Sequence, residues 1–194
     1  MKKKLNRLPN RNTGLSLFWI LLPLLFWACQ DKNDPRPEAQ KQHHLQQVHQ
    51  TLDRWHEAAA KADFENYVNQ MTANAVFVGT DATENWNRPD FEAFSKPYFT
   101  QGKAWSFTAV QRNVYFSNDY KTAWFDELLD TQMKLCRGSG VLQYQNQSWK
   151  IAHYVLSIAV PNNRVEELVN LKKHTDSLLL LKLKEKPLIT TVNK

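Results

Sequence analysis

The residues best suited to chemistry lie between Tyr120 and Ser157, in the second half of the chain. There Glu127 and His153 stand inside otherwise apolar segments, and Arg112 precedes them. A carboxylate or an imidazole in an enclosed pocket can remove a proton next to a carbonyl group, and a guanidinium can stabilise the resulting oxyanion. We therefore take Glu127 and His153 as candidate catalytic residues and Arg112 as a candidate ligand-binding residue.

Whether these side chains meet depends on how the strands that carry them pair. Alternating apolar residues and short polar turns predict strands over residues 105–116, 121–130, 134–145 and 149–160. With the shortest turns that the polar residues allow, Glu127 lies opposite Gly138. Gly140 lies opposite Phe125 and also opposite His153. Arg112 likewise pairs with Phe125, so Arg112, Glu127 and His153 share one face of the predicted sheet.

We assign this face to a pocket, because Gly138 and Gly140 remove side-chain volume where an enclosed site needs room. Phe125 and Tyr144 lie on the same face and are candidate ligand-binding residues. Trp86, the large aromatic residue of a polar loop, is a further candidate at the rim of the pocket.

A single β-bulge would exchange the two faces of the sheet, because side chains alternate along a strand. The alternative site would then have Asp126 and Tyr154 as catalytic residues. Its ligand-binding residues would be Trp124 and Arg137.

Each of these polar residues also has a purely structural interpretation. Glu127 with Arg112, and Asp126 with Arg137, could be ion pairs on partly buried strands. Cys136 is expected to be a small buried strand residue. His43, His44 and His49 are expected on the solvated side of a helix, and no ligand set at metal spacing accompanies them. The sequence therefore predicts no metal and no cofactor.

The elements before the strands are mostly helical. Apolar residues at spacings of three and four predict a long helix up to about residue 62, and a short helix capped by Asp63 follows. A short strand over 75–78 and a helix from Pro89 to Gly102 come next. A last helix opens at Asn163, and its leucine run, 178–181, is expected to dock on the sheet or on a partner subunit. Helices on one side of a curved antiparallel sheet make an α+β domain.

The N-terminal segment predicts a cellular address. A basic start is followed by an apolar run over residues 15–28, which is typical of a signal peptide over residues 1–28. Cys29 is then the candidate lipidation site of a bacterial lipoprotein, and residues 29–42 form a flexible linker. Removing residues 1–28 leaves 20 basic residues against 19 acidic ones, and no basic stripe suggests binding to nucleic acid.

A set of short segments, in their order and spacing, resembles the SnoaL-like branch of the nuclear transport factor 2-like superfamily. They are GTDATENW, KPYF, AWFDELLD, CRGSGVL and WKIAHYVLS. The resemblance covers about Leu45 to Val160. It implies a cone-shaped fold whose sheet curls around a pocket, and dimers formed through the outer face of the sheet. Members include isomerases, cyclases and dehydratases, and also proteins without demonstrated chemistry, so the resemblance implies the fold and not an activity.

Three functions fit these observations. The leading interpretation is a membrane-anchored lipoprotein of the bacterial envelope, periplasmic or surface-facing, whose domain over residues 43–160 binds a small, partly apolar molecule. The second is an isomerase, cyclase or dehydratase that uses acid–base residues in its pocket. The third is a non-catalytic homodimeric interaction module whose pocket is filled by side chains. Residues 161–194 are expected to form a C-terminal helix and tail outside the domain.

Overall fold

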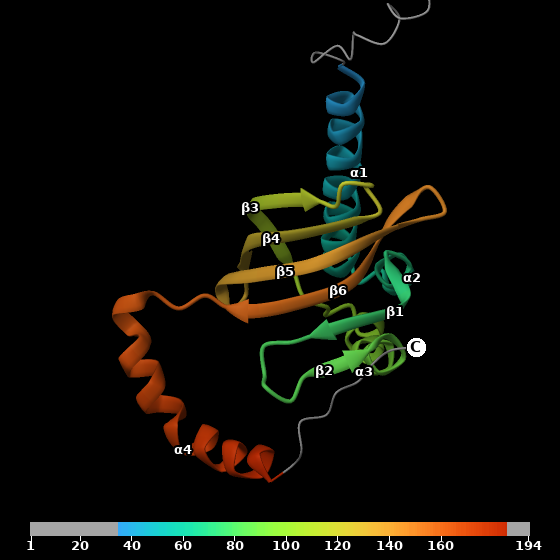
Figure 1. Cartoon of the computed structure of the whole chain (residues 1–194). Helices are drawn as coiled ribbons and strands as arrows, with labels where there is room; N and C mark the ends of the chain where they lie inside the picture. The colour runs from blue at the N-terminus through green and yellow to red at the C-terminus, as the bar shows by residue number, and fades with distance from the viewer. Residues whose placement is uncertain (1–34, 186–194) are drawn as a thin grey trace, which may run out of the picture. The chain divides into compact units, whose positions relative to one another are not determined.

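The computed structural model describes residues 35–185 of the chain, and Figure 1 shows their arrangement. The chain divides into a short unit, Met1–Ala39, and a main unit, Gln40–Lys194, which carries the sheet. The predicted signal peptide and Cys29 lie outside the described residues. The predicted linker is wrong at its C-terminal end, because residues from Pro35 onward already form the first helix.

Three helices precede or interrupt the sheet: α1 (Pro35–Ala60), α2 (Phe64–Asn69) and α3 (Arg88–Thr100). The predicted cap of α2 is confirmed, since the Asp63 side chain accepts a hydrogen bond from the backbone N–H of Asn66 at 3.1 Å. Helix α3 has Pro89 in its first turn and is capped by Asn87, whose side chain accepts from the Asp90 N–H at 3.0 Å.

The sheet has six strands in the order β2-β1-β6-β5-β4-β3. Their bounds are β1 Met71–Val78, β2 Asn85–Asn87, β3 Phe107–Phe116, β4 Thr122–Thr131, β5 Lys134–Gln145 and β6 Ser148–Ile158. The predicted antiparallel meander is confirmed for β3 to β6. Two features were not predicted: β1 pairs with β6 in parallel, and the short strand β2 contains Trp86.

Helix α1 covers the inner face of the curved sheet (Figure 1). The Trp55 ring of α1 lies 4.7 Å from the Tyr154 ring of β6, centroid to centroid. The core consists of the apolar stripe of α1 and the inward side chains of the strands, including Val48, Leu52, Trp55, Leu129, Leu142, Trp149 and Ile151. The predicted α+β class with a curved sheet is confirmed. Register shifts in three of the strand pairs accompany the curvature.

The C-terminal part begins with a 3-10 turn, η2 (Asn162–Arg164), and continues as α4 (Val165–Lys184). The predicted docking of the leucine run on the sheet is not found in the described chain, because Leu178, Leu180 and Leu181 are all at least 50% exposed. None of the helices between residues 35 and 185 is long and apolar enough to cross a membrane.

Candidate functional site

The pairing of β4 with its neighbours places the predicted carboxylate where the sequence indicated. Glu127 lies opposite Gly138 of β5, and Phe125 lies opposite Gly140, as predicted. Arg112 lies opposite Glu127 rather than Phe125, because the loop from β3 to β4 is longer than the assumed turn. The displacement is two residues, so Arg112 stays on the predicted face.

The prediction for His153 is wrong in position, because β6 contains a bulge. Val141 pairs with His153, but the next residue of β5, Leu142, pairs with Ile151, so Ala152 is left over. This extra residue turns His153 to the outer face and Tyr154 to the inner face, opposite Gly140. Glu127 from the first predicted site and Tyr154 from the alternative site therefore lie on the same face of the sheet.

The two glycines of β5 do not leave an open space. A Cβ atom at Gly138 would lie 2.3 Å from the Tyr154 hydroxyl oxygen, and one at Gly140 would lie 2.3 Å from the backbone oxygen of His153 and 2.8 Å from the Phe125 ring. The volume that we assigned to a ligand is occupied by these two buried side chains. The glycines therefore allow the core to pack and do not shape a pocket.

Glu127 is the centre of a charge cluster, which we define as Glu127, Arg112, His56 and Tyr154. One carboxylate oxygen, Oε1, lies 2.8 Å from His56 Nε2, and the other, Oε2, accepts a hydrogen bond from Arg112 Nε at 2.8 Å. The Tyr154 hydroxyl donates to Oε1 over 3.5 Å. Arg112 also donates to Asp53 of α1 at 2.8 Å. The Arg112 side chain is 6% exposed, and the Glu127 side chain is 0% exposed.

The protonation equilibria of the charge cluster follow from this burial. Burial alone would raise the pKa of Glu127, but the hydrogen bonds and charges of His56 and Arg112 outweigh it and lower the pKa. Burial, followed by the nearby Glu127 carboxylate, raises the pKa of Tyr154 well above its ordinary value. Glu127 is thus an ionised carboxylate with both oxygens paired, and it is a poor base for an external substrate.

Sequence reasoning missed His56, which ties α1 to the sheet through Glu127. A signal was present, since His44, Val48, Leu52 and His56 follow each other at intervals of four and all are buried. The expected solvated position is also wrong for His44, whose ring stacks on Tyr120 at a centroid distance of 5.0 Å. His49 lies against Arg112, with Nδ1 and Nη1 3.3 Å apart.

The other predicted residues lie in separate places. Trp124, Asp126 and Arg137 are on the outer face, where Trp124 stacks on Tyr115 at 6.0 Å and Asp126 lies 3.8 Å from Arg137. Tyr144 is half-buried beside Trp149 at a ring distance of 5.2 Å. These residues and the charge cluster do not form one site.

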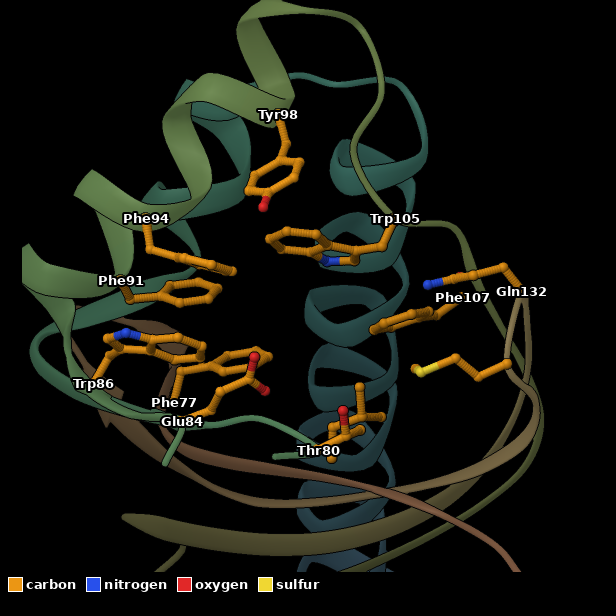
Figure 2. Close-up of a pocket in the computed structure, with 12 residues that line it drawn as sticks. Phe77, Thr80, Glu84, Trp86, Phe91, Phe94, Tyr98, Trp105, Phe107 and Gln132 are labelled. Atoms are coloured by element: carbon orange, nitrogen blue, oxygen red, sulfur yellow. The ribbon is translucent and has the colours of Figure 1, made fainter. Parts of the chain in front are cut away.

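The structure does contain a cavity on the inner side of the sheet, at the end formed by α3, β2 and the loops beside them (Figure 2). Its volume is about 260 Å³. We call it the aromatic cavity, and it is lined by Phe77, Thr80, Glu84, Trp86, Phe91, Phe94, Tyr98, Trp105, Phe107, Gln132, Met133 and Leu156. Of the predicted ligand-binding residues, Trp86 is the one that lies here.

The rings of the aromatic cavity support each other. Phe77 stacks on Phe91 at a centroid distance of 4.2 Å, and Trp86 stacks on Phe94 at 4.5 Å. Trp105 and Phe107 come from the opposite side (Figure 2). Such stacked pairs hold ring positions through shape and quadrupole contacts, so this wall is preformed for a flat or apolar guest.

The aromatic cavity and the charge cluster share walls but are distinct. The Phe107 ring lies 6.1 Å from the His56 ring, and the Phe77 ring lies 5.4 Å from the Tyr154 ring. Neither Glu127 nor Arg112 lines the cavity. In the described part of the chain, no group of at least three His, Cys, Asp or Glu side chains is placed to hold a metal ion.

Comparisons with known proteins agree with this architecture. A model of the SnoaL-like domain family matches residues 48–161. Among solved structures, a proposed dehydratase of the NTF2-like family from Streptomyces avermitilis is 15% identical, with 62% of this chain and 99% of that chain covered and a TM-score of 0.54. An NTF2-like protein with a cystatin-like fold from Novosphingobium aromaticivorans is 8% identical, with coverages of 72% and 97% and a TM-score of 0.54. No curated protein sequence matches this chain.

Proposed function

This chain belongs to the SnoaL-like domain family, and from that premise we propose that it binds a small, largely apolar, ring-bearing molecule in the aromatic cavity. The observation that carries the proposal is the set of aromatic side chains around an unfilled volume of about 260 Å³. Pockets for drug-sized molecules measure roughly 300–1,000 Å³. The expected ligand is therefore smaller, with a single ring or a compact bicyclic core.

Binding, rather than catalysis, is favoured by what the aromatic cavity contains. Its polar lining consists of Thr80, Glu84, Gln132, the Tyr98 hydroxyl and the indole N–H groups of its two Trp residues. The buried Glu127 carboxylate has both of its oxygens hydrogen-bonded within the charge cluster, to His56 and to Arg112. A general base must reach the proton that it removes. Glu127 does not line the aromatic cavity, so it could reach a bound ligand only if the residues between it and the cavity moved.

Native mass spectrometry of the unit that starts at Gln40 tests this proposal. We expect a co-purified small molecule whose mass is lost after denaturation. Met133→Trp should fill the aromatic cavity from the turn between β4 and β5 and remove the bound mass, whereas Met133→Ala should retain it. An apo spectrum, together with tryptophan fluorescence that does not respond to small aromatic probes, would count against the proposal.

Acid–base catalysis is the second candidate, and one observation favours it. His56 Nε2 lies 2.8 Å from Glu127, and the His56 ring is next to Phe107, which lines the aromatic cavity. A carboxylate that orients an imidazole is a common arrangement for a general base. A turnover assay on any ligand that is identified tests this, with His56→Gln expected to abolish activity and keep ligand affinity.

We propose in addition that the protein is a lipid-anchored component of the bacterial envelope, periplasmic or surface-facing. The apolar run over residues 15–28 and the cysteine directly after it support this address. Cys29→Ser should abolish labelling by a radioactive or clickable fatty acid. Labelling that persists in this variant would show that the lipid is attached elsewhere.

A homodimer through the outer face of the sheet is also proposed. Tyr115 and Trp124, stacked on each other, are 46% and 47% exposed. Covering such an aromatic pair removes apolar area from water. Light scattering should give twice the monomer mass at micromolar concentration, and Trp124→Lys should halve it. A wild-type monomer at that concentration would contradict this proposal.

A further inference from the structure

The charge of the aromatic cavity is one-sided. Glu84 is the one carboxylate among the residues that line the cavity, and no Lys, Arg or His lines it. Glu84 forms no ion pair with a described residue. A ligand that enters this cavity therefore meets aromatic rings and a single unneutralised carboxylate.

The Glu84 carboxylate is held in place by the loop between β1 and β2. The backbone N–H of Asp81 donates to Glu84 Oε2 at 3.1 Å, and the Gly79 N–H donates to the Glu84 carbonyl oxygen at 2.9 Å. A Cβ atom at Gly79 would lie 2.1 Å from Glu84 Oε2, so the absence of a side chain there leaves room for this carboxylate. Oε1 has no hydrogen-bond partner within residues 35–185. Figure 2 shows Glu84 among the residues that line the cavity, with its carboxylate directed toward the cavity.

The charge of the guest decides how it interacts with this carboxylate. An anionic guest would be repelled by Glu84, and a neutral apolar guest would displace water from the carboxylate without replacing its hydrogen bonds. A cationic guest pairs with Glu84 and is also attracted by the electron-rich faces of aromatic rings, Trp most strongly. Two of the lining residues are Trp.

We propose that the ligand of the aromatic cavity is an organic cation, an amine or quaternary ammonium attached to a ring or a short apolar group. Its apolar part contacts the stacked rings and its charged group lies at Glu84. This inference rests on the proposed binding function and adds the chemical class of the ligand.

The test compares three probes of similar size on the full chain by isothermal titration calorimetry: benzyltrimethylammonium, benzyl alcohol and phenylacetate. We expect benzyltrimethylammonium to bind at least about tenfold more tightly than benzyl alcohol, because it pairs with the Glu84 carboxylate. Phenylacetate should bind most weakly, because the same carboxylate repels it. Raising the salt concentration should weaken binding of the cation and leave the alcohol unaffected.

The variant Glu84→Gln keeps the shape of the side chain and removes its charge. It should weaken binding of benzyltrimethylammonium by about tenfold and change the affinity for benzyl alcohol by less than about twofold. Glu65→Gln is the matched control, because Glu65 is exposed on α2 and does not line the cavity. It should leave both affinities unchanged.

The outcomes separate this inference from the proposed function. Equal binding of the cation and the alcohol, or a Glu84→Gln variant that keeps its preference for the cation, overturns the inference and leaves the binding function in place. Absence of binding by all three probes overturns both. The comparison of probes on the wild-type protein needs no variant, so the test does not depend on the folding of Glu84→Gln.

Discussion

The charge cluster and the aromatic cavity lie on the same side of the sheet, and they differ in how many carboxylate oxygens remain available to a ligand. In the charge cluster, Glu127 uses both oxygens on His56 and Arg112, and its side chain is fully buried. In the aromatic cavity, Glu84 has one oxygen without a partner among the described residues, and the rings surround a volume of about 260 Å³.

This difference separates a structural group from a binding group. A buried carboxylate whose two oxygens are both hydrogen-bonded inside the fold has no acceptor left for a ligand. A preformed apolar wall with an unpaired polar atom has both surface and hydrogen-bonding capacity available. The polar residues in the middle of the sheet therefore indicate how α1 is fixed, and the rings at its end indicate where a ligand binds.

The largest expected effect is on the charge cluster. Glu127→Gln removes the charge that pairs with Arg112 and should lower the free energy of unfolding by about 3 kcal/mol, as expected for a broken buried pair. Chemical denaturation measures this loss. Ligand affinity of the protein that stays folded should not change, because Glu127 does not line the aromatic cavity.

Asp126→Asn is the matched control for that variant. Asp126 is the neighbouring carboxylate on the outer face, 3.8 Å from a more exposed Arg137. Removing an exposed pair of this kind should cost less than about 1 kcal/mol. Equal losses for the two variants would contradict the assignment of Glu127 as the buried centre.

The second effect tests the packing over the glycines. Gly138→Ala places a Cβ atom 2.3 Å from the Tyr154 hydroxyl oxygen and should destabilise the fold by about 1–3 kcal/mol, the usual cost of overpacking. Tyr154→Phe removes that oxygen, so the double variant should recover part of the loss. A double-mutant cycle from thermal or chemical unfolding measures this coupling. Additive losses would indicate that the hydroxyl is not the obstacle.

Much of the fold could be predicted because its signals are local. The turn at Asn146 and Gln147 is an example, since both residues have positive φ values, 49° and 61°, as a tight hairpin requires. The site could be predicted only in part. Glu127 and Arg112 were found as neighbours, but the extra residue Ala152 reversed the faces of His153 and Tyr154, and no local pattern marks a bulge.

The partners of the site from outside the sheet were missed for a different reason. The interval of four that places His56 on the buried side of α1 was visible, but its partner, Glu127, is 71 residues away, and register alone does not show which helix covers a strand. Similarly, the helix that carries Phe91, Phe94 and Tyr98 was predicted, but the cavity beside it was not. The space in front of them depends on the loops that pack opposite.

The third effect concerns the aromatic cavity alone. Tyr98→Ala removes one ring of its wall and should weaken binding of an aromatic probe by up to about tenfold, since an aromatic contact contributes roughly 0.5–1.5 kcal/mol. Tyr115→Ala is the control, because Tyr115 is 46% exposed, against 45% for Tyr98, and lies on the outer face. Fluorescence titration should show the loss in the first variant only. Equal effects would mean that the probe binds elsewhere.

The smallest effect returns to α1, as a dependence of stability on pH. Burial lowers the pKa of His44 from 6.5, with His43 adding to the shift. Burial also lowers the pKa of His49 from 6.5, with Arg112 adding to the shift and Asp53 and Glu127 opposing it. Below pH 6.5 the unfolded chain therefore binds more protons than the folded one, and stability is lost as the pH falls. The pKa of Glu127 is lowered from 4.5, so the stability that this carboxylate contributes is lost only below that pH.

Urea unfolding between about pH 7.5 and pH 5.5 should show a fall in stability that His44→Gln and His49→Gln each reduce, because each removes one of the groups that takes up a proton on unfolding. A fall of the same size in the wild type and both variants would show that His44 and His49 are not the source of the pH dependence.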